Sequence, residues 1–149
     1  MDAASFTDLR RTVRFGDTDA AGVMHFHQLL RWCHEAYEES LERYGLDLTL
    51  IFPSGDPAPE VALPIVHCSA DYRAPLLCGD RLRIQLHPER LDPSAFAIRF
   101  HFARGDHTAA TALTRHLAIE RLSRRRCPLP APIQRWLEAA SLGQGVRPL

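Results

Sequence analysis

Two carboxylates separated by one residue, Asp17 and Asp19, stand in the small-residue segment Phe15–Gly22. Directly after this segment the hydrophobic residues change to a 3.6-residue spacing, so a helix is predicted to begin near His25 and Phe26. The first N–H groups of a helix have no intrahelical acceptor and carry partial positive charge. A carboxylate beside such donors can cleave a thioester, because a thiolate with a reference pKa near ~8.5 leaves with little protonation.

The residues alone leave the role of each acid open. An Asp before a helix most often caps it or interacts with its dipole, so the catalytic role of Asp19 is the sharper of two hypotheses. Whether Asp19 would attack the carbonyl itself or activate water is equally open, since both routes need an ionised carboxylate. Asp17 is predicted to be structural. Gly16 and Gly22 are predicted to let the backbone turn and approach closely.

Other chemistries have weaker support. No G-x-S-x-G motif occurs, and Cys33 falls on the apolar stripe of the predicted helix, which disfavours serine and cysteine hydrolases. His25 and His27 raise a zinc site, but two histidines at this spacing on a helix point apart and no acid stands at a matching offset, so no metal is predicted. His25 is instead predicted to line the substrate pocket or the start of the helix.

The composition limits the class of protein. The 149 residues are 46% hydrophobic and 24% charged with a formal net charge of zero, which is typical of one ordinary globular domain and argues against a nucleic-acid partner. All 18 basic residues are Arg, so Schiff-base lysine chemistry and the Walker phosphate loop are excluded. Without a C-x-x-C pair, a signal peptide or a membrane-spanning run, the sequence predicts a cytoplasmic protein that does not insert into membranes.

The predicted elements are one long helix, a set of strands and a short second helix. The long helix runs from about Met24 to Gly45, which can take the left-handed conformation that ends helices. Its predicted buried stripe comprises Leu29, Cys33, Ala36, Tyr37, Ser40, Leu41 and Tyr44. Strands are predicted over Ser5–Phe15, Val61–Leu76, Asp80–Leu91, Ser94–Arg104 and His107–Leu122, and the short helix over Ile133–Leu142. Short turns between the later strands indicate an antiparallel meander, and the whole order indicates an α+β domain.

The motif D-T-D-x-x-G-[VI], met here within Phe15–Val23 and followed by the long helix, resembles that of the hotdog-fold acyl-CoA thioesterases of the 4-hydroxybenzoyl-CoA type. The resemblance covers about Leu9 to Leu122 of a single domain, residues 1–149, with a basic segment and short helix over residues 123–149. It implies a curved antiparallel sheet of about five strands wrapped around one central helix. The segment Arg124–Pro130, followed by Trp136 and Leu137, is most similar to the 1,4-dihydroxy-2-naphthoyl-CoA thioesterases of the phylloquinone (vitamin K1) pathway.

The resemblance implies a reaction and a set of partners. The substrate would be an aromatic acyl-CoA, 1,4-dihydroxy-2-naphthoyl-CoA, hydrolysed to the free acid and coenzyme A with no cofactor beyond the coenzyme A of the substrate. A homodimer would join two sheets edge to edge with active sites at the boundary, and two dimers would pair into a tetramer. Two alternatives remain open: a thioesterase for aliphatic acyl-CoA or acyl-carrier-protein substrates, and a non-catalytic acyl-binding protein.

The resemblance also assigns residues. The catalytic carboxylate falls on Asp19, and the oxyanion-binding N–H falls near Phe26, with His25 beside it at the helix start. Related aromatic thioesterases carry a basic pair in the turn between the third and fourth strands, where this chain has Leu91-Asp92-Pro93-Ser94. That usual phosphate contact is therefore missing here. Because the chain has no Lys, the remaining candidates for the phosphates of coenzyme A are arginines: Arg90, Arg124, Arg125 and Arg126.

Overall fold

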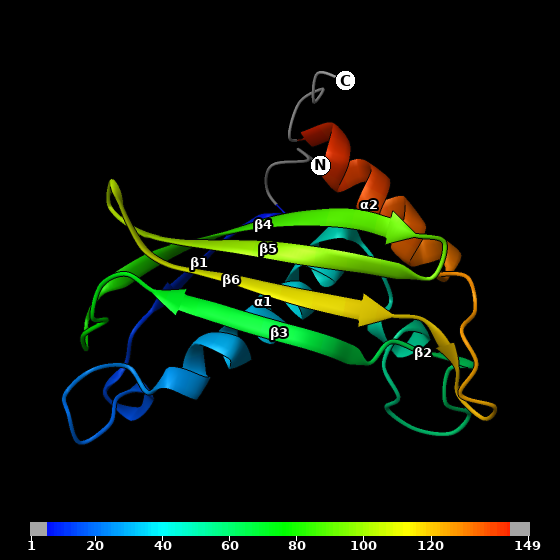
Figure 1. Cartoon of the computed structure of the whole chain (residues 1–149), viewed down its shortest axis with the longest axis horizontal. Coiled ribbons are helices and arrows are strands. Elements are labelled where there is room, and N and C mark those ends of the chain that lie inside the picture. The colour runs from blue at the N-terminus through cyan, green and yellow to red at the C-terminus, as the bar shows by residue number, and fades with distance from the viewer. Residues whose placement is uncertain (1–5, 144–149) are drawn as a thin grey trace.

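The computed structural model describes residues 6–143, and within them an antiparallel sheet of five strands curves over one long helix (Figure 1). The order across the sheet is β1-β4-β5-β6-β3. These strands are β1 (Asp8–Thr12), β3 (Ile65–Tyr72), β4 (Arg81–Asp92), β5 (Ala95–Arg104) and β6 (His107–Leu117). The helices are α1 (Phe26–Tyr44) and α2 (Ala131–Gly143), and two 3-10 turns lie at Phe15–Asp17 and Leu48–Leu50. The predicted α+β architecture is confirmed.

The topology differs from the simple meander that the turns indicate. Strands β4, β5 and β6 do follow one another, but β3 pairs with β6 at the far edge instead of with β4. The predicted strand Val61–Leu76 is broken at Pro64, which has no N–H to donate, and its first part pairs separately as β2 (Val61–Ala62) with β7 (Ile119–Glu120). The first predicted strand is also shorter, because a 3-10 turn begins at Phe15, whose side chain is exposed. Ser5 lies outside the described residues.

Helix α1 buries the stripe that its spacing predicts, with two differences. Trp32 is buried although the prediction omits it, and Tyr44 is only partly buried. Gly45 ends the helix with φ 102°, the left-handed conformation that a side chain disfavours, and its N–H donates to the carbonyls of Leu41 and Glu42. The predicted end of the helix is confirmed.

The core lies between α1 and the concave face of the sheet. Alternation along β4 and β5 buries Leu82, Ile84, Leu86, Ile98, Phe100 and Phe102, as their spacing predicts. Helix α2 closes one end of this core through Ile133, Trp136 and Leu137. The indole N–H of Trp136 donates to the hydroxyl of Ser40 at 3.0 Å, which ties α2 to α1. Among residues 6–143, no helix is long and apolar enough to cross a membrane.

Candidate active site

The connection between β1 and α1 forms a small hairpin that holds Asp19. Thr18 and Met24 make an antiparallel bridge, and the N–H of Asp19 donates to the carbonyl of Val23 at 2.9 Å. Gly22 has φ 81°, so the prediction that a glycine lets the backbone turn here is confirmed. The predicted close approach is wrong, because an added Cβ at Gly22 would meet no atom within 4 Å. The same prediction is wrong for Gly16: its φ is not positive, and an added Cβ would meet no atom within 4 Å.

Asp19 is exposed and lines a pocket of about 410 Å³ between the start of α1 and the end of β3. Its Oδ1 accepts a hydrogen bond from the N–H of Ala21 at 2.8 Å, which fixes the carboxylate in its turn. Its other carboxylate oxygen accepts no hydrogen bond from the residues of the described range. Asp19 does not cap α1, because the N-cap is His25. The alternative hypothesis, that Asp19 serves as the cap of α1, is therefore wrong.

At the start of α1, one backbone N–H has no acceptor among residues 6–143. Phe26 lines this pocket, and among the hydrogen bonds of the described chain none uses its N–H. The prediction of a second free donor at His25 is wrong, because the N–H of His25 donates to the carbonyl of Asp17 at 2.9 Å. The N–H of His27 makes only a long contact of 3.4 Å with Nδ1 of His25. Of His25, Phe26 and His27, Phe26 is the residue whose N–H has no acceptor in the described chain, and its role as oxyanion donor stays a prediction.

His25 and His27 lie close together, contrary to the prediction that their rings diverge. Their ring centroids are 4.0 Å apart and their Nδ1 atoms are in contact. The reason is that His25 is the N-cap, with extended backbone angles, and so does not follow the angular spacing of helical residues. His25 marks the helix start but is not part of the lining of the Asp19 pocket. In residues 6–143 no group of three His, Cys, Asp or Glu side chains is arranged to hold a metal ion.

Asp17 makes structural contacts. Its Oδ2 accepts a hydrogen bond from the N–H of Arg14 at 2.8 Å, and its carbonyl holds the N–H of His25. It lines a second pocket, of about 720 Å³, on the β1 side of the sheet. The two acids of the motif therefore face different pockets, although only Thr18 separates them.

The structure does not bring the predicted phosphate-binding arginines to Asp19 within one chain. Arg90 donates from Nε to the carbonyl of Asp92 at 3.3 Å, and Arg126 lies 3.9 Å from the carboxylate of Asp92. Both side chains therefore contact the turn between β4 and β5, and neither lines the Asp19 pocket.

Arg124 and Arg125 stand in an exposed turn after β7. The N–H of Arg124 donates to the carbonyl of Glu120 at 2.9 Å, and the carbonyl of Arg125 accepts from the N–H of Glu120 at 2.8 Å. This turn lies beside the start of β3, whereas the Asp19 pocket lies at the end of β3. At about 3.3 Å per residue, the length of β3 separates the two places by about 23 Å.

These two places lie at opposite ends of the sheet (Figure 1). None of Arg90, Arg124, Arg125 and Arg126 lines the Asp19 pocket of its own chain, so their predicted role in binding the phosphates of coenzyme A is untested by a single copy. The number of residues between Asp19 and these arginines does not predict their distance in space, because that distance depends on the order and curvature of the strands. A contact between these arginines and the substrate stays a prediction that requires a second copy of the chain.

Sequence reasoning missed most of the pocket lining, including Tyr72 and Arg73 at the end of β3. The hydroxyl of Tyr72 donates to the carbonyl of Phe26, which fixes the first turn of α1 against the strand. Burial raises the pKa of Tyr72, so this donor stays protonated at neutral pH. The partners are 46 positions apart, and no local pattern predicts that contact. Only the pairing of β3 with β6 at the sheet edge brings them together.

The fold, the pocket and the motif agree with one class of protein. The family model described as the thioesterase-like superfamily matches residues 13–137. The chain belongs to this family, and the hotdog fold that the motif implies is confirmed.

Particular relatives can now be given. A protein of Synechococcus sp. strain CC9605 named 1,4-dihydroxy-2-naphthoyl-CoA hydrolase is 58% identical over 150 residues, covering 100% of both chains. A crystal structure from Prochlorococcus marinus strain MIT 9313, described as that of a candidate thioesterase, matches with TM-score 0.92 and 57% identity over 94% of this chain and 99% of that one. A 1,4-dihydroxy-2-naphthoyl-CoA thioesterase from Synechocystis matches with TM-score 0.80 and 37% identity over 88% and 94%.

Proposed function

We propose that this protein hydrolyses 1,4-dihydroxy-2-naphthoyl-CoA to 1,4-dihydroxy-2-naphthoate and coenzyme A, in the cytoplasm and as a step of phylloquinone biosynthesis. The relatives that are 50–58% identical and carry this activity in their names support the choice of acyl group. The observation that carries the reaction type is one pocket lined by both Asp19 and Phe26. One carboxylate oxygen of Asp19 accepts no hydrogen bond, and the N–H of Phe26 has no acceptor, in the described chain.

In the proposed reaction the thioester carbonyl oxygen points at the N–H of Phe26. That donor is positioned before the reaction begins, and one such donor is commonly worth about 10²–10³ in rate. Asp19 faces the carbonyl carbon through its unbonded oxygen. Either that oxygen attacks and expels the coenzyme A thiolate, leaving a mixed anhydride that water then hydrolyses, or it removes a proton from the attacking water. Both routes end in the carboxylic acid and a thiolate that takes up the proton.

The first test is Asp19→Asn. The amide oxygen of Asn can still accept the hydrogen bond from Ala21, so the loop is expected to keep its shape while the charge is lost. We expect kcat to fall by about 10³ with a nearly unchanged KM. The matched control is Asp106→Asn, in the exposed turn between β5 and β6, which should keep full activity. An Asp19→Asn enzyme with near-normal kcat would rule out the assigned site.

A substrate panel tests the acyl group separately. Thiol release from 1,4-dihydroxy-2-naphthoyl-CoA should exceed release from aliphatic acyl-CoA thioesters of short and medium length by at least about tenfold in kcat/KM. The reverse order would overturn the aromatic substrate while leaving the thioesterase assignment in place.

Isotope labelling addresses the role of Asp19 in a single turnover in H₂¹⁸O. An anhydride that water opens at the carboxyl carbon of Asp19 leaves the label on Asp19, where mass analysis of the protein detects it. General-base catalysis, or an anhydride that water opens at its acyl carbon, places the label in the released acid and leaves Asp19 unlabelled. A labelled Asp19 is therefore the outcome that decides for nucleophilic attack.

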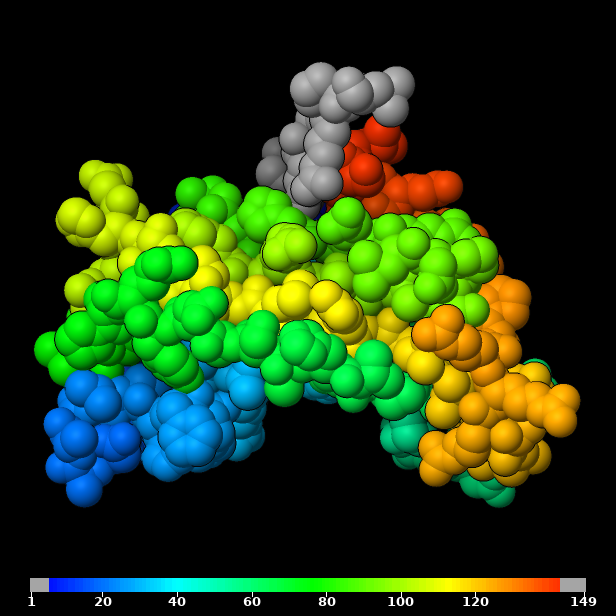
Figure 2. Space-filling view, viewed as in Figure 1, coloured from blue at the N-terminus to red at the C-terminus, as the bar shows by residue number. Residues whose placement is uncertain are grey.

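The proposal includes a homodimer joined along β3, with two dimers forming a tetramer. Figure 2 shows the β3 edge uncovered, above a hollow between the loop before α1 and the orange segment after β7. Antiparallel pairing of β3 with the same strand of a second copy places the start of one β3 beside the end of the other. The turn that holds Arg124, Arg125 and Arg126 in each copy then approaches the Asp19 pocket of the other. Within one chain the arginine turn and the Asp19 pocket are separated by the length of β3, about 23 Å at about 3.3 Å per residue. In this dimer the arginines of one copy would instead lie beside the pocket of the other and could reach the substrate phosphates.

A further inference from the structure

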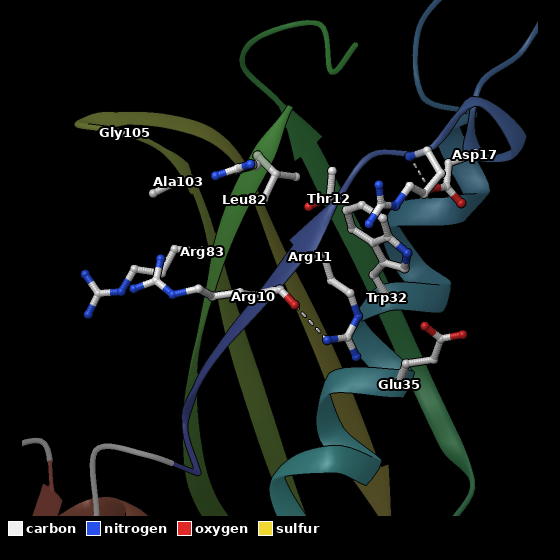
Figure 3. A pocket seen from close by; sticks show the side chains of 12 residues that line it. Arg10, Arg11, Thr12, Asp17, Trp32, Glu35, Leu82, Arg83, Ala103 and Gly105 are labelled. Atoms are coloured by element: carbon white, nitrogen blue, oxygen red, sulfur yellow. Dashed lines mark hydrogen bonds between the residues drawn. The ribbon is translucent and has the colours of Figure 1, made fainter. Parts of the chain in front are cut away.

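The second pocket, of about 720 Å³, lies at the opposite edge of the sheet, where β1 meets β4 and the side of α1 (Figure 3). Its lining shares no residue with that of the Asp19 pocket. Five of the lining residues are arginines: Arg10, Arg11, Arg14, Arg81 and Arg83. The chain as a whole has a formal net charge of zero, so this pocket concentrates positive charge locally. Pockets of this size hold compounds larger than a single small ion.

The strand register forces several of these arginines onto one face. Arg10 of β1 stands directly opposite Arg83 of β4, and Thr12 stands opposite Arg81. Because side chains alternate along a strand, all four project from the same face of the sheet. Figure 3 shows Arg10 and Arg83 extending together, whereas Arg11 points toward α1. Like charges directly opposite each other on paired strands are destabilising unless something neutralises them.

Carboxylates of the described chain neutralise this cluster only in part. Asp8 accepts three hydrogen bonds from Arg83, at 2.7, 2.9 and 3.0 Å, and Glu39 pairs with Arg11 at 2.6 Å. Within residues 6–143, Arg10, Arg14 and Arg81 form no ion pair with a carboxylate within 4.0 Å.

The two acidic residues in the lining, Asp17 and Glu35, already have other partners. Glu35 pairs with Arg31 at 3.0 Å, outside the pocket, and Asp17 is bonded to the N–H of Arg14. A single phosphate monoester carries about two negative charges at neutral pH, fewer than the three guanidiniums that lack a carboxylate. The hydroxyl of Thr12 adds a neutral donor between them.

We propose that this pocket binds an anion bearing two or more phosphate groups, held by Arg10, Arg81 and Arg14. Guanidinium groups match phosphate oxygens in paired geometry, and a polyphosphate neutralises the charge of the arginines that have no carboxylate partner. The phosphates could belong to a free phosphorylated compound or, in place of the contact proposed for residues 124–126, to the nucleotide end of a coenzyme A thioester. The second source rests on the proposed function, whereas the site itself does not.

The direct test is titration of the full chain with inorganic pyrophosphate at low ionic strength, by calorimetry and by thermal unfolding. We expect saturable binding and a raised Tm. Arg10→Gln and Arg81→Gln should each weaken binding by about tenfold, the usual effect of losing a hydrogen bond to a charged group. The matched control is Arg99→Gln, an exposed arginine on β5 outside the pocket, expected to change binding by less than about twofold. No saturable binding, or an equal loss in Arg99→Gln, overturns the proposal.

A second set of measurements identifies the source of the phosphates. If coenzyme A displaces pyrophosphate, pantetheine does not, and Arg10→Gln raises KM for the acyl-CoA without changing kcat, the pocket serves the substrate. If coenzyme A fails to displace pyrophosphate, the pocket is still an anion-binding site, and its ligand is a free phosphorylated compound. Binding of pyrophosphate is measured without turnover, so an inactive enzyme would contradict the proposed function and leave this site intact.

Discussion

The two edges of the sheet differ in length, charge and exposure. Strand β1 has five residues, and its adjacent arginines, Arg10 and Arg11, carry charge on its two faces. Strand β3 has eight residues, and its Ile65, Val66 and Tyr72 are 40%, 59% and 44% exposed. Short strands and charged side chains prevent a sheet edge from pairing with another chain, and a long apolar edge invites it. The molecule therefore has one protected edge and one edge suited to assembly.

Each edge also has its own pocket. The Asp19 pocket is bounded by the end of β3 through Tyr72 and Arg73, and the arginine-rich pocket is bounded by β1 and the start of β4. The hairpin around Gly22 belongs to the single connection that leads from β1 to α1. The proposed chemistry and the proposed assembly thus share the β3 side, and anion binding is proposed on the β1 side.

The largest effect is expected from giving β3 the character of β1. Val66→Arg places a charge on the apolar edge, and in a symmetric interface the change enters twice, where burying like charges costs several kcal/mol. We expect the oligomer to dissociate and kcat/KM to fall by at least about tenfold, because the second copy no longer completes the site. Sedimentation velocity and thiol release measure these two effects. Leu142→Arg, at an 81% exposed position of α2, is the control, and an intact Val66→Arg oligomer would contradict the assembly.

A second effect concerns the buried support behind β3. His116 of β6 stands opposite Ile65 and stacks on Phe96 with ring centroids 4.5 Å apart. Burial, with a smaller contribution from His34, lowers the pKa of His116 from 6.5 to about 3. The unfolded chain therefore takes up a proton first as the pH falls. This group's contribution to stability is complete above pH ~6.5 and decreases by about 1.4 kcal/mol per pH unit below it, down to about pH 3.

Urea unfolding between pH 7 and pH 5 should show a loss of about 2 kcal/mol from this histidine. His116→Phe keeps the aromatic stacking and should remove that part of the pH dependence. An equal slope in both proteins would show that His116 is not held neutral. Following the oligomer by light scattering over the same range separates dissociation along β3 from unfolding of the subunit.

The sequence predicted best the features that depend on local pattern. The stripe of α1, its end at Gly45 and the alternation of β4 and β5 follow from residue spacing, and all are confirmed. The placement of β3 beside β6 could not be predicted, because pairing between distant strands depends on packing that no local pattern records. For the same reason Tyr72 and the arginines facing each other across β1 and β4 were missed.

At the site, the motif predicted the position of Asp19 and the helix start but misjudged the donors. His25 was taken as free although it closes the loop on the carbonyl of Asp17. The N–H of the cap residue His25 has an acceptor, whereas the N–H of Phe26, the first helical residue, has none within the described residues. Which N–H is free thus depends on the exact residue at which the helix begins. The catalytic role of Asp19 stays a prediction.

A smaller effect on stability and activity is expected from a change at Gly22, in the loop that connects β1 to α1. Gly22→Ala forces a side chain into φ 81°, which should cost about 1–2 kcal/mol and shift Asp19. We expect a lower Tm and a drop in kcat with little change in pyrophosphate binding at the β1 edge. Gly16→Ala is the matched control, because that glycine has no positive φ and open space around its Cβ position. Equal Tm values for the two variants would contradict the prediction that position 22 requires a glycine.

The smallest effect should be found on the β1 side, where its sign is informative. Asp8 and Arg83 form a half-exposed pair, with side chains 27% and 45% exposed, so Asp8→Asn should cost at most about 1 kcal/mol of stability. The Arg83 guanidinium holds the pKa of Asp8 below its usual value, so the carboxylate is charged at neutral pH and competes with any bound anion. Its removal should therefore tighten pyrophosphate binding by about threefold, since one nearby charge at a solvated site is worth less than about 1 kcal/mol. Calorimetry on Asp8→Asn, with Asp106→Asn as control, measures this gain, and weaker binding in Asp8→Asn would mean that Arg83 needs its partner to hold the pocket in shape.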